Sequence, residues 1–396
     1  MPRSSWERPG RDPEGPKPAT PGLLRSINDR VVLDLLLEHG ALSRSDVWRL
    51  TGVSKPTASQ SLTRLEESGH VLQSGVEESA RGGRATTMYR LNPAAGYAAA
   101  VDVTPAGVTV QIADILGTVI GEHRSAQAGR PQDAVDALLI ALRAAGIEGS
   151  RLSSLVVALP GSFDPDADLL RFAPHLPHWQ EPGLRGRLEQ AIGAPASIEN
   201  DVNLVAMAEQ RTGAAQQEED FLLLWSDEGI GSAIVLDGHL HRGSSGGAGE
   251  VAYLLVPGVP VVRNPVRTDH GGYNDLTGGD AIRELAAQHG LPGETPHDAV
   301  AAAVASGFGD FVTELASRYA VGLASAIALL DPPAIVLAGR TLDAGGPVLR
   351  DAIRAELDEI SIRTPRLLLG GAGRDAVLAG ALLLGLENTR DRVFST

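Results

Sequence analysis

Apolar residues recur at helical spacing in the first part of the chain. Residues 23–38 (LLRSINDRVVLDLLLE) carry them every three or four positions, which predicts one amphipathic helix. A second, short helix is expected after Ser43, whose hydroxyl can cap it, with Asp46 at the capping-box position. Val47 and Leu50 should face inward. The longer helix is expected to pack beneath the short elements that follow it.

A third helix should follow a turn at Gly52. Ser54 is placed to cap this helix, and Pro56 lies early enough in it to cost no hydrogen bond. Gly69 is expected to end it. Its buried stripe, again at helical spacing, should comprise Ala58, Leu62 and Leu65.

The third helix exposes short or flexible polar groups on its other side. Base edges and phosphates in a major groove donate and accept hydrogen bonds, and a recognition helix reads them chiefly from its N-terminal residues. The pattern therefore predicts a helix-turn-helix that binds DNA; an ordinary solvated helical hairpin is the alternative. The candidate DNA-binding residues are Ser54, Lys55, Thr57, Ser59, Gln60, Thr63 and Arg64.

A strand-like segment with a Gly-rich tip comes next, after HVLQSG and an acidic spacer. Residues 80–92 (ARGGRATTMYRLN) alternate like two strands, and Arg81 and Arg84 flank the two glycines of the tip. Two guanidiniums on such a tip can lie along phosphates or enter a minor groove. A surface hairpin with solvated arginines is the alternative. Directly after a helix-turn-helix, a DNA-binding wing is favoured.

From Tyr97 onward, short strand-like runs and helices alternate in two similar rounds. The first round has strand-like runs at 98–103, 108–114, 118–123, 152–161 and 196–200, with helices at 131–145, 182–191 and 201–212. The second has strand-like runs at 220–225, 231–238, 239–243, 334–339 and 366–373, with helices between 278 and 330 and over 375–386. Two meander-plus-helix halves are the pattern of the actin-like ATPase and sugar kinase fold, where nucleotide and substrate lie between two lobes.

Composition adds an asymmetry of charge to this picture. Residues 1–92 hold 13 basic and 11 acidic residues, whereas the rest of the 396-residue chain holds 21 and 38. An acidic body with a mildly basic head fits a protein that contacts DNA through the head alone. Residues 1–22 are rich in Pro, Gly, Arg and Glu, lack a signal-peptide pattern, and are expected to be a disordered tail.

Two further features bound the function. The chain has no cysteine, which rules out disulfides and thiolate metal sites. No apolar run approaches the length that spans a bilayer, so a cytoplasmic protein without membrane contact is expected.

Four places in the body carry candidate chemistry: 159–179 (LPGSFDPDADLLRFAPHLPHW), 198–203 (IENDVN), 244–253 (SSGGAGEVAY) and the nucleotide side. With the two-round pattern, they make residues 23–388 resemble the ROK family of repressors and sugar kinases, in its regulator form. The resemblance implies an α/β protein: a winged helix-turn-helix at 23–92, then a two-lobed, ribonuclease H-like body with lobes at 97–205 and 206–388. The last helix is one that can pack back on the first lobe.

The resemblance implies that Asn200, Asp201 and Glu250 hold sugar hydroxyls, with Asp201 as general base if the protein is a kinase. Asn200 or Asp201 as a mere helix cap is the alternative. His175 stands where the family usually has Asn, and it is either a ligand contact or a surface loop residue. A sugar or sugar phosphate is the implied effector.

Zinc is not expected. The family has a zinc-binding His where this chain has Tyr253, and its zinc cysteines are absent here. The segment that follows offers His270 and Asp275, which do not make a tetrahedral set. No metal or other cofactor is therefore predicted, apart from ATP and magnesium if kinase activity is retained.

The nucleotide side keeps some family residues and loses others. Asp102 is retained, but Pro105 removes a phosphate-binding N–H and larger residues replace glycines. The remaining vestigial nucleotide residues are Gly229, Gly231 and Gly339.

Three functions compete on these grounds. The first is a sugar-responsive regulator, by resemblance a repressor, which binds an inverted-repeat operator as a homodimer or dimer of dimers. The second is an active ROK sugar kinase with a DNA-binding head. The third is a repressor that senses a partner protein or a phosphorylated sugar without catalysis.

Overall fold

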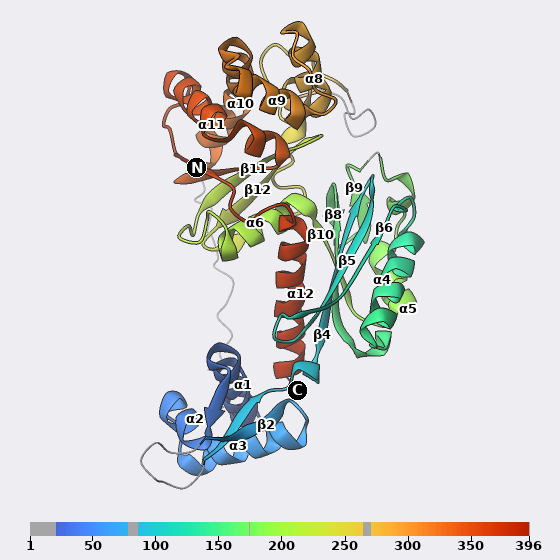
Figure 1. Ribbon diagram of the computed structural model, residues 1–396, viewed down its shortest axis with the longest axis vertical. Helices are drawn as coiled ribbons and strands as arrows, with labels where there is room; N and C mark the ends of the chain where they lie inside the picture. The colour runs from blue at the N-terminus through green and yellow to red at the C-terminus, as the bar shows by residue number, and fades with distance from the viewer. Residues whose placement is uncertain (1–20, 78–85, 174, 264–270, 396) are drawn as a thin grey trace, which may run out of the picture. The chain divides into compact units, whose positions relative to one another are not determined.

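The computed structural model describes residues 21–77, 86–173, 175–263 and 271–395 (Figure 1). The chain divides into two units. The first runs to Ala95 and takes in the C-terminal residues from Asp391, and the second comprises Gly96–Arg390. The chain thus leaves the first unit once and returns to it at its end.

The described residues up to Ala95 form the helices α1, α2 and α3 and a small antiparallel sheet. The sheet has the strand order β1-β3-β2, with β3 in the centre. Val32, Val47, Leu62 and Tyr89, drawn from four elements, are at most 2% exposed and form its core. The elements are α1 (Pro21–His39), β1 (Ala41–Ser43), α2 (Arg44–Thr51), α3 (Lys55–Glu67), β2 (Val71–Glu77) and β3 (Thr86–Leu91).

The predicted caps are confirmed. Ser43 Oγ accepts the Asp46 N–H at 3.1 Å, and the Asp46 carboxylate accepts the Ser43 N–H at 3.1 Å, which completes the capping box. Ser54 caps α3, and Gly52 ends α2 in the left-handed region with φ 69°. These local signals delimit both helices.

Two details of this unit differ from expectation. Leu50 was expected to face inward but is 44% exposed. Helix α2 has only eight residues, and helical spacing alone does not show which of its residues lie beyond the edge of the core. Strand β2 begins at Val71, so residues expected to precede the wing form its first strand. Arg81, Arg84 and the tip between them lie outside the described residues.

The second unit contains two five-stranded sheets of the same topology. Their strand orders are β10-β7-β4-β5-β6 and β15-β14-β11-β12-β13, each an antiparallel meander extended by two parallel strands. The two rounds read from the sequence are these two sheets. The strands are β4 (Tyr97–Thr104), β5 (Gly107–Asp114), β6 (Val119–Ser125), β7 (Leu152–Leu159), β10 (Ala196–Asn200), β11 (Phe221–Ser226), β12 (Ile230–Leu236), β13 (His239–Leu240), β14 (Ala334–Ala338) and β15 (Arg366–Leu369).

Helices cover both faces of each sheet, which explains why the central strands are apolar almost without a break. In β7, Val156 packs toward α12 (Ala376–Phe394), whereas the adjacent Val157 packs toward α4 (Pro131–Ala145) and α5 (Leu184–Ile192) (Figure 1). In β11, Leu223 packs against α6 (Asp201–Thr212) on one face of the sheet. The adjacent Leu224 belongs to the core on the other face, which five helices cover. These are α7 (Asn274–Thr277), α8 (Gly279–Gln288), α9 (Pro296–Ser306), α10 (Gly309–Leu330) and α11 (Arg340–Ile360).

Helices α6 and α12 connect the two sheets. They cross so closely that a Cβ on Gly380 would lie 1.9 Å from the Leu204 carbonyl oxygen. Leu382 of α12 joins the cluster on the first sheet, and Val205 of α6 joins the cluster on the second. The last helix therefore packs on the first lobe, and the lobe boundary expected at residue 206 falls inside α6.

Two elements were not expected from the sequence. The Asp- and Pro-rich loop after β7 contains a hairpin, β8 (Ser162–Asp164) with β9 (Leu169–Arg171). Helix α11 was also missed, since its Gly346–Pro347 pair reads as a break; the backbone is in fact kinked there, with Gly346 at φ 49°.

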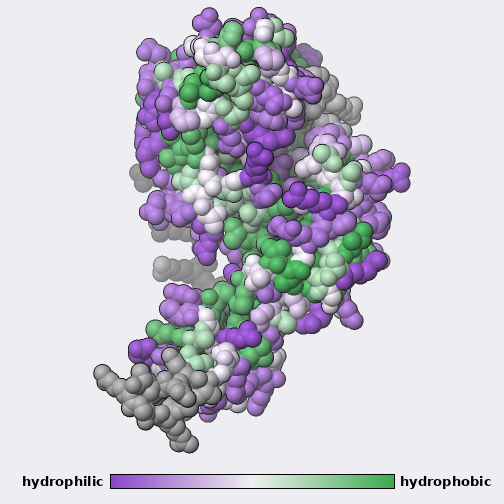
Figure 2. Space-filling view, in the orientation of Figure 1, coloured by the Kyte–Doolittle hydropathy of each residue, from purple (hydrophilic) through white to green (hydrophobic). Residues whose placement is uncertain are grey.

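The visible surface is mainly hydrophilic, with smaller hydrophobic areas between (Figure 2). Among the described residues, no helix is both long and apolar enough to cross a membrane.

Candidate functional site

A small pocket, open to solvent, lies beside the start of α6 in the second unit. One side comes from the end of β10 and the first turn of α6, and the other from β12 and the Gly-rich segment after β13. It therefore brings together two motifs that are about fifty residues apart. The lining residues are Asn200, Val202, Asn203, Gly231, Ser232, Gly246, Ala248, Gly249 and Glu250.

Asn200 is held at the edge of this pocket by two hydrogen bonds. Its Oδ1 accepts the Asn203 N–H at 3.0 Å and so caps α6, and its Nδ2 donates to the Gly161 carbonyl at 2.9 Å. Gly161 has φ 96°, and a Cβ there would lie 2.5 Å from the Arg171 carbonyl oxygen. The capping role considered from the sequence is thus real, and it fixes Asn200 beside the pocket.

Three carboxyl groups from distant parts of the chain influence one another here. Burial raises the pKa of Asp201 to about 7, and the charges of Asp102 and Glu250 add to this. Burial likewise raises the pKa of Glu250 to about 7. The pKa of Asp102 is raised to about 6 by burial and by the charge of Asp375. Near neutral pH this group carries less than its full negative charge, which suits it to accept and donate hydrogen bonds to hydroxyls.

The Gly-rich segment is anchored to the first lobe by an ion pair. Arg242 Nε donates to Glu199 Oε2 at 2.6 Å, and Glu199 Oε1 accepts from Asn203 Nδ2 at 2.8 Å. Glu199 is 7% exposed, so the pair is well shielded on the acid side. The anchor precedes the glycines directly.

Glycine is required at two positions of the segment. Gly246 has φ 79°, and a Cβ there would lie 2.2 Å from the Phe163 carbonyl oxygen. Gly249 has φ 89°, and its carbonyl accepts from Ser232 Oγ at 2.8 Å. The backbone of the Gly-rich segment therefore packs directly against Phe163 and Ser232, and this contact sets the position of Glu250.

Tyr253 occupies the position where the family has a zinc-binding His. The ring of Tyr253 lies 5.4 Å from that of Phe172, so an aromatic contact occupies this place. Among the described residues, no group of three or more His, Asp or Glu side chains is arranged to hold a metal. His270 lies outside the described residues. His175 is exposed and is not among the pocket-lining residues.

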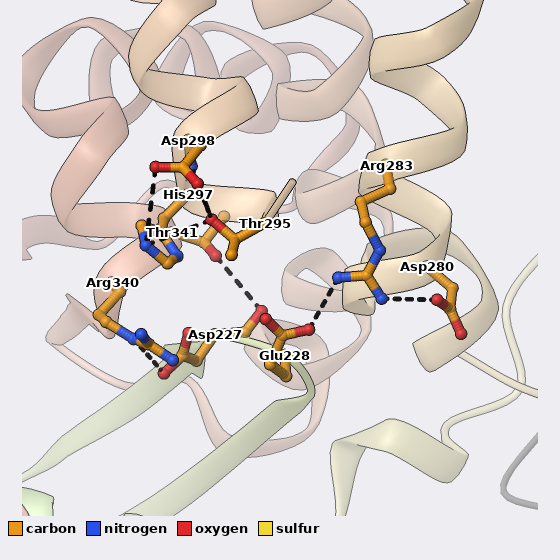
Figure 3. Close-up of polar contacts among 9 residues, drawn as sticks. All are labelled: Asp227, Glu228, Asp280, Arg283, Thr295, His297, Asp298, Arg340 and Thr341. Carbon is orange, nitrogen blue, oxygen red and sulfur yellow. Dashed lines mark hydrogen bonds and ion pairs between the residues drawn. The ribbon is translucent and has the colours of Figure 1, made fainter. Parts of the chain in front are cut away.

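Ion pairs hold the loop between β11 and β12, where the sequence predicted the nucleotide side (Figure 3). Arg340 Nε donates to Asp227 Oδ2 at 2.8 Å, and Thr341 Oγ1 donates to the Asp227 carbonyl at 3.3 Å. Arg283 donates to Glu228 at 2.8 Å and to Asp280 at 2.6 Å. Both acids of the loop between β11 and β12 are therefore engaged by arginines.

The vestigial glycines of this side have different surroundings. Gly339 has φ 99°, and a Cβ there would lie 2.4 Å from the Ser226 carbonyl oxygen. A Cβ on Gly231 would lie 2.9 Å from Val202, whereas one on Gly229 would meet nothing within 4 Å. Gly339 and Gly231 are thus required for packing, and Gly231 also lines the pocket.

Several polar side chains of α3 bond within the first unit. The hydroxyls of Ser54 and Thr57 lie 2.8 Å apart. Thr63 Oγ1 donates to the Ser59 carbonyl at 3.0 Å. These four residues partly satisfy their own hydrogen-bonding capacity.

The longer polar side chains of α3 differ in how accessible they are to a ligand. Lys55 and Gln60 are exposed, and the Lys55 ammonium lies 4.4 Å from the ring centroid of Trp48. Arg64, by contrast, donates to Asp29 of α1 at 2.6 Å. Arg64 therefore ties α3 to α1, and Lys55 and Gln60 are the more accessible.

Arg44 belongs to the same surface but was not singled out from the sequence. Its guanidinium donates to the Ser59 hydroxyl and, at 2.9 Å, to the Tyr89 hydroxyl. It adds positive charge next to α3. The available signal is a basic residue directly after the capping Ser43.

Two like sheets with a pocket at the start of the connecting helix define an α/β protein of the actin-like sugar-kinase fold. The chain belongs to the ROK family, whose model matches residues 99–387.

Known proteins similar to this chain include regulators and a kinase. The xylose repressor of Bacillus subtilis (strain 168) is 26% identical over 59% of this chain and 61% of its own length, so the match spans less than two thirds of that repressor. A solved ROK family transcriptional regulator, described as a homolog of the E. coli MLC protein, superposes with a TM-score of 0.71 at 21% identity, over 94% of this chain and 97% of its own. The ROK hexokinase from Thermus thermophilus superposes with a TM-score of 0.59 at 27% identity, over 73% and 97%.

Proposed function

We propose that this protein is a sequence-specific transcriptional regulator, acting as a repressor, whose first unit binds operator DNA and whose second unit binds a sugar or sugar derivative. The observation that carries the proposal is the pair α2 and α3, two capped helices joined by a turn at Gly52 and followed by a two-stranded hairpin, on a chain of the ROK family. The name of the B. subtilis relative, a xylose repressor, supports it.

In this role the first unit is a winged helix-turn-helix and α3 is its recognition helix. The exposed Lys55 and Gln60 lie at or near its N-terminal half, where such helices meet base edges. Arg44 and the wing arginines Arg81 and Arg84 supply phosphate contacts. Thr57 and Ser59, which are partly exposed, add shorter polar contacts.

The second unit would hold the effector in the pocket described above. Glu250 on the lining and the neighbouring Asp201 accept hydrogen bonds from hydroxyls, and Asn203 and Ser232 add neutral polar groups on the lining. Carboxylates beside amides are suited to vicinal hydroxyls. The pocket lies between segments of both lobes, so a bound sugar would affect how α6 and the Gly-rich segment meet.

Loss of kinase activity is part of the proposal. Phosphate bound at the loop between β11 and β12 would lie close to the carboxylates of Asp227 and Glu228, whose negative charge disfavours an anion there. The Arg340 and Arg283 side chains that could offset it are already paired with these acids. No cofactor or metal is part of the proposed function.

An active sugar kinase is the second candidate, favoured by one observation. The pKa of Asp201, raised to about 7 by burial and by the neighbouring acids, suits a general base near neutral pH. The hexokinase similarity points the same way. A coupled assay for ADP release with D-glucose and D-xylose separates the candidates, because a regulator without catalysis releases none above background.

The main proposal is tested by selecting DNA that the full chain binds and footprinting it. We expect an inverted repeat bound by a homodimer or dimer of dimers in the cytoplasm of its host, with affinity that changes when the sugar is added. Binding that shows no sequence preference, or a single unpaired half-site, would rule this proposal out.

A further inference from the structure

Ser162 carries a buried hydroxyl group that the pocket as described does not use. The residue is 1% exposed, and its Oγ has no hydrogen-bond partner among the residues that the structure describes. Buried polar groups in proteins are nearly always hydrogen-bonded, so an unpartnered one calls for an explanation. It begins β8, directly after Gly161, whose carbonyl fixes Asn200.

The hydroxyl lies directly against the Gly-rich wall of the pocket. A Cβ built on Gly246 would be 3.3 Å from Ser162 Oγ, and one built on Gly247 would be 3.7 Å from it. Gly246 itself lines the pocket. Because these residues have no side chains, the Ser162 hydroxyl packs against the backbone that forms this wall of the pocket.

An aromatic ring lies close to one of these glycines. The ring of Phe172 would lie 3.9 Å from a Cβ on Gly247, and the same ring contacts Tyr253. Phe172 has φ 57°, an uncommon backbone conformation for a residue with a side chain and one that occurs often near binding sites. A neutral substituent, such as a hydroxyl or hydroxymethyl group, matches a serine hydroxyl beside an aromatic ring.

Charge excludes an anionic substituent at this place. The pocket lining contains no Lys or Arg, and Glu250 and the nearby Asp201 are acids. Arg171, the strand partner of Ser162, is bound to Asp164 at 3.1 Å, and Arg242 is bound to Glu199 at 2.6 Å. A phosphate or carboxylate on the ligand would therefore meet like charge without a free cation to offset it.

We propose that Ser162 is a specificity-determining residue of the effector pocket, and that the effector is an unphosphorylated, uncharged sugar one of whose hydroxyls hydrogen-bonds to Ser162 Oγ. The proposal rests on the proposed function, because it concerns the same sugar pocket. It narrows the effector class from sugars and sugar phosphates to neutral sugars.

Titration calorimetry on the full chain tests the proposal, with D-xylose, D-glucose, N-acetyl-D-glucosamine and D-glucose 6-phosphate as probes. We expect at least one neutral sugar to bind and the phosphate ester not to bind. Ser162→Ala should weaken binding of that sugar about tenfold, the value of one hydrogen bond. A monodeoxy derivative lacking the contacted hydroxyl should bind the wild type and Ser162→Ala equally well, a result that a merely structural role would not produce.

Ser226→Ala is the matched control, since Ser226 is also fully buried but its hydroxyl is bonded to that of Tyr319 at 2.6 Å. It should lower the melting temperature of the ligand-free protein and leave sugar affinity unchanged, whereas Ser162→Ala should not lower the melting temperature. Unchanged affinity of Ser162→Ala for the bound sugar, or binding of the phosphate ester alone, overturns the inference and leaves the proposed function standing. If no probe binds the wild type while operator binding is intact, both this inference and the sugar-sensing part of the proposed function fail.

Discussion

Arg340 Nε donates to Asp227 Oδ2 at 2.8 Å, which joins the first turn of α11 to the loop between β11 and β12. The Asp227 side chain is 19% exposed and that of Arg340 is 54% exposed, so the pair is partly shielded on the acid side only. The loop is the one that resembles a phosphate-binding turn. Both acids of this loop, Asp227 and Glu228, are therefore already paired with arginines of the protein.

This ion pair predicts that a non-hydrolysable ATP analogue with magnesium will not raise the melting temperature of the wild type. Replacing both acids, as Asp227→Gly with Glu228→Gly, should produce a measurable shift, because the repulsion on phosphate is removed. Arg350→Ala is a control that should bind no nucleotide, because Arg350 is paired with Asp351 and with neither acid of the loop. A shift of several degrees in the wild type would contradict the prediction and revive the kinase candidate.

The exposed side chains of α3 predict a loss of sequence discrimination when they are shortened. Lys55→Ala or Gln60→Ala should weaken binding to the selected operator by about 1–3 kcal/mol while leaving binding to random DNA nearly the same. Fluorescence anisotropy with both DNAs measures the difference. Glu67→Ala, exposed at the far end of the same helix, serves as the control. Equal losses on operator and random DNA would show that these residues contact phosphates instead of bases.

The position of Asp201 beside the pocket predicts that the response to sugar can be removed without loss of DNA binding. Asp201→Ala should keep operator affinity in the absence of sugar and lose the response to sugar, because a ligand shifts an equilibrium only by its differential affinity for the two states. Operator binding with and without the sugar, together with a thermal melt, measures both properties. A folded variant that still responds with unchanged affinity would place sensing elsewhere.

The raised carboxyl pKa values predict the sign of a pH dependence. Burial raises the pKa of Asp201 and of Glu250 to about 7, well above their unfolded values. The folded state then binds more protons than the unfolded state between about pH 4 and 7, so the contribution of these groups to stability is present at low pH and is lost as the pH rises through 7.

Melting temperatures from pH 5 to pH 8 check this. The double variant Asp201→Asn, Glu250→Gln should gain stability over the wild type at pH 8 and gain little at pH 5. Asp351→Asn is the control: Arg350 lowers the pKa of that exposed carboxyl, so removing it should not reproduce the gain at pH 8. Parallel pH curves for the wild type and the double variant would refute the assignment.

The backbone of the Gly-rich segment predicts a position-specific cost of adding one methyl group. Gly246→Ala places a Cβ 2.2 Å from the Phe163 carbonyl oxygen at φ 79°, whereas Gly258→Ala has φ 84° and nothing within 4 Å. Gly258→Ala is the control, and its free energy of unfolding should fall only by the conformational cost of a left-handed backbone, about 1–2 kcal/mol. Gly246→Ala should lower the free energy of unfolding by more and should also weaken sugar binding. Denaturant unfolding of both variants measures the difference. Similar losses in the two would mean that the segment moves freely away from Phe163.

Much of this protein follows from short-range features of its sequence. The capping box of Ser43 and Asp46, the cap at Ser54 and the apolar stripe with Leu62 are local, so helical geometry alone predicts α2 and α3. The two rounds of strands and helices also come from local periodicity, and they correspond to two sheets of the same topology. The motif around Asn200 was likewise recognisable, because its residues are contiguous.

Other features depend on contacts between distant residues. Arg64 was a candidate DNA contact, yet it bonds to Asp29, 35 residues earlier, and no spacing rule predicts that pairing. Leu50 fits the inward pattern of α2 but is exposed. The kinked α11 was hidden because a Gly-Pro pair usually ends a helix. The helical backbone is indeed interrupted at Gly346, and the segment after it packs Leu349 and Ile353 on the second core.

The site itself is the clearest case of tertiary control. The sequence by itself identified Asp102, Asp201 and Glu250 as separate candidates, but their raised pKa values arise because folding buries all three and brings Asp201 close to the other two. Ser162 carried no signal at all, since a serine at the start of a short strand is unremarkable. Its buried hydroxyl against Gly246 exists only because the β8 hairpin and the Gly-rich segment, more than eighty residues apart, meet in the folded chain.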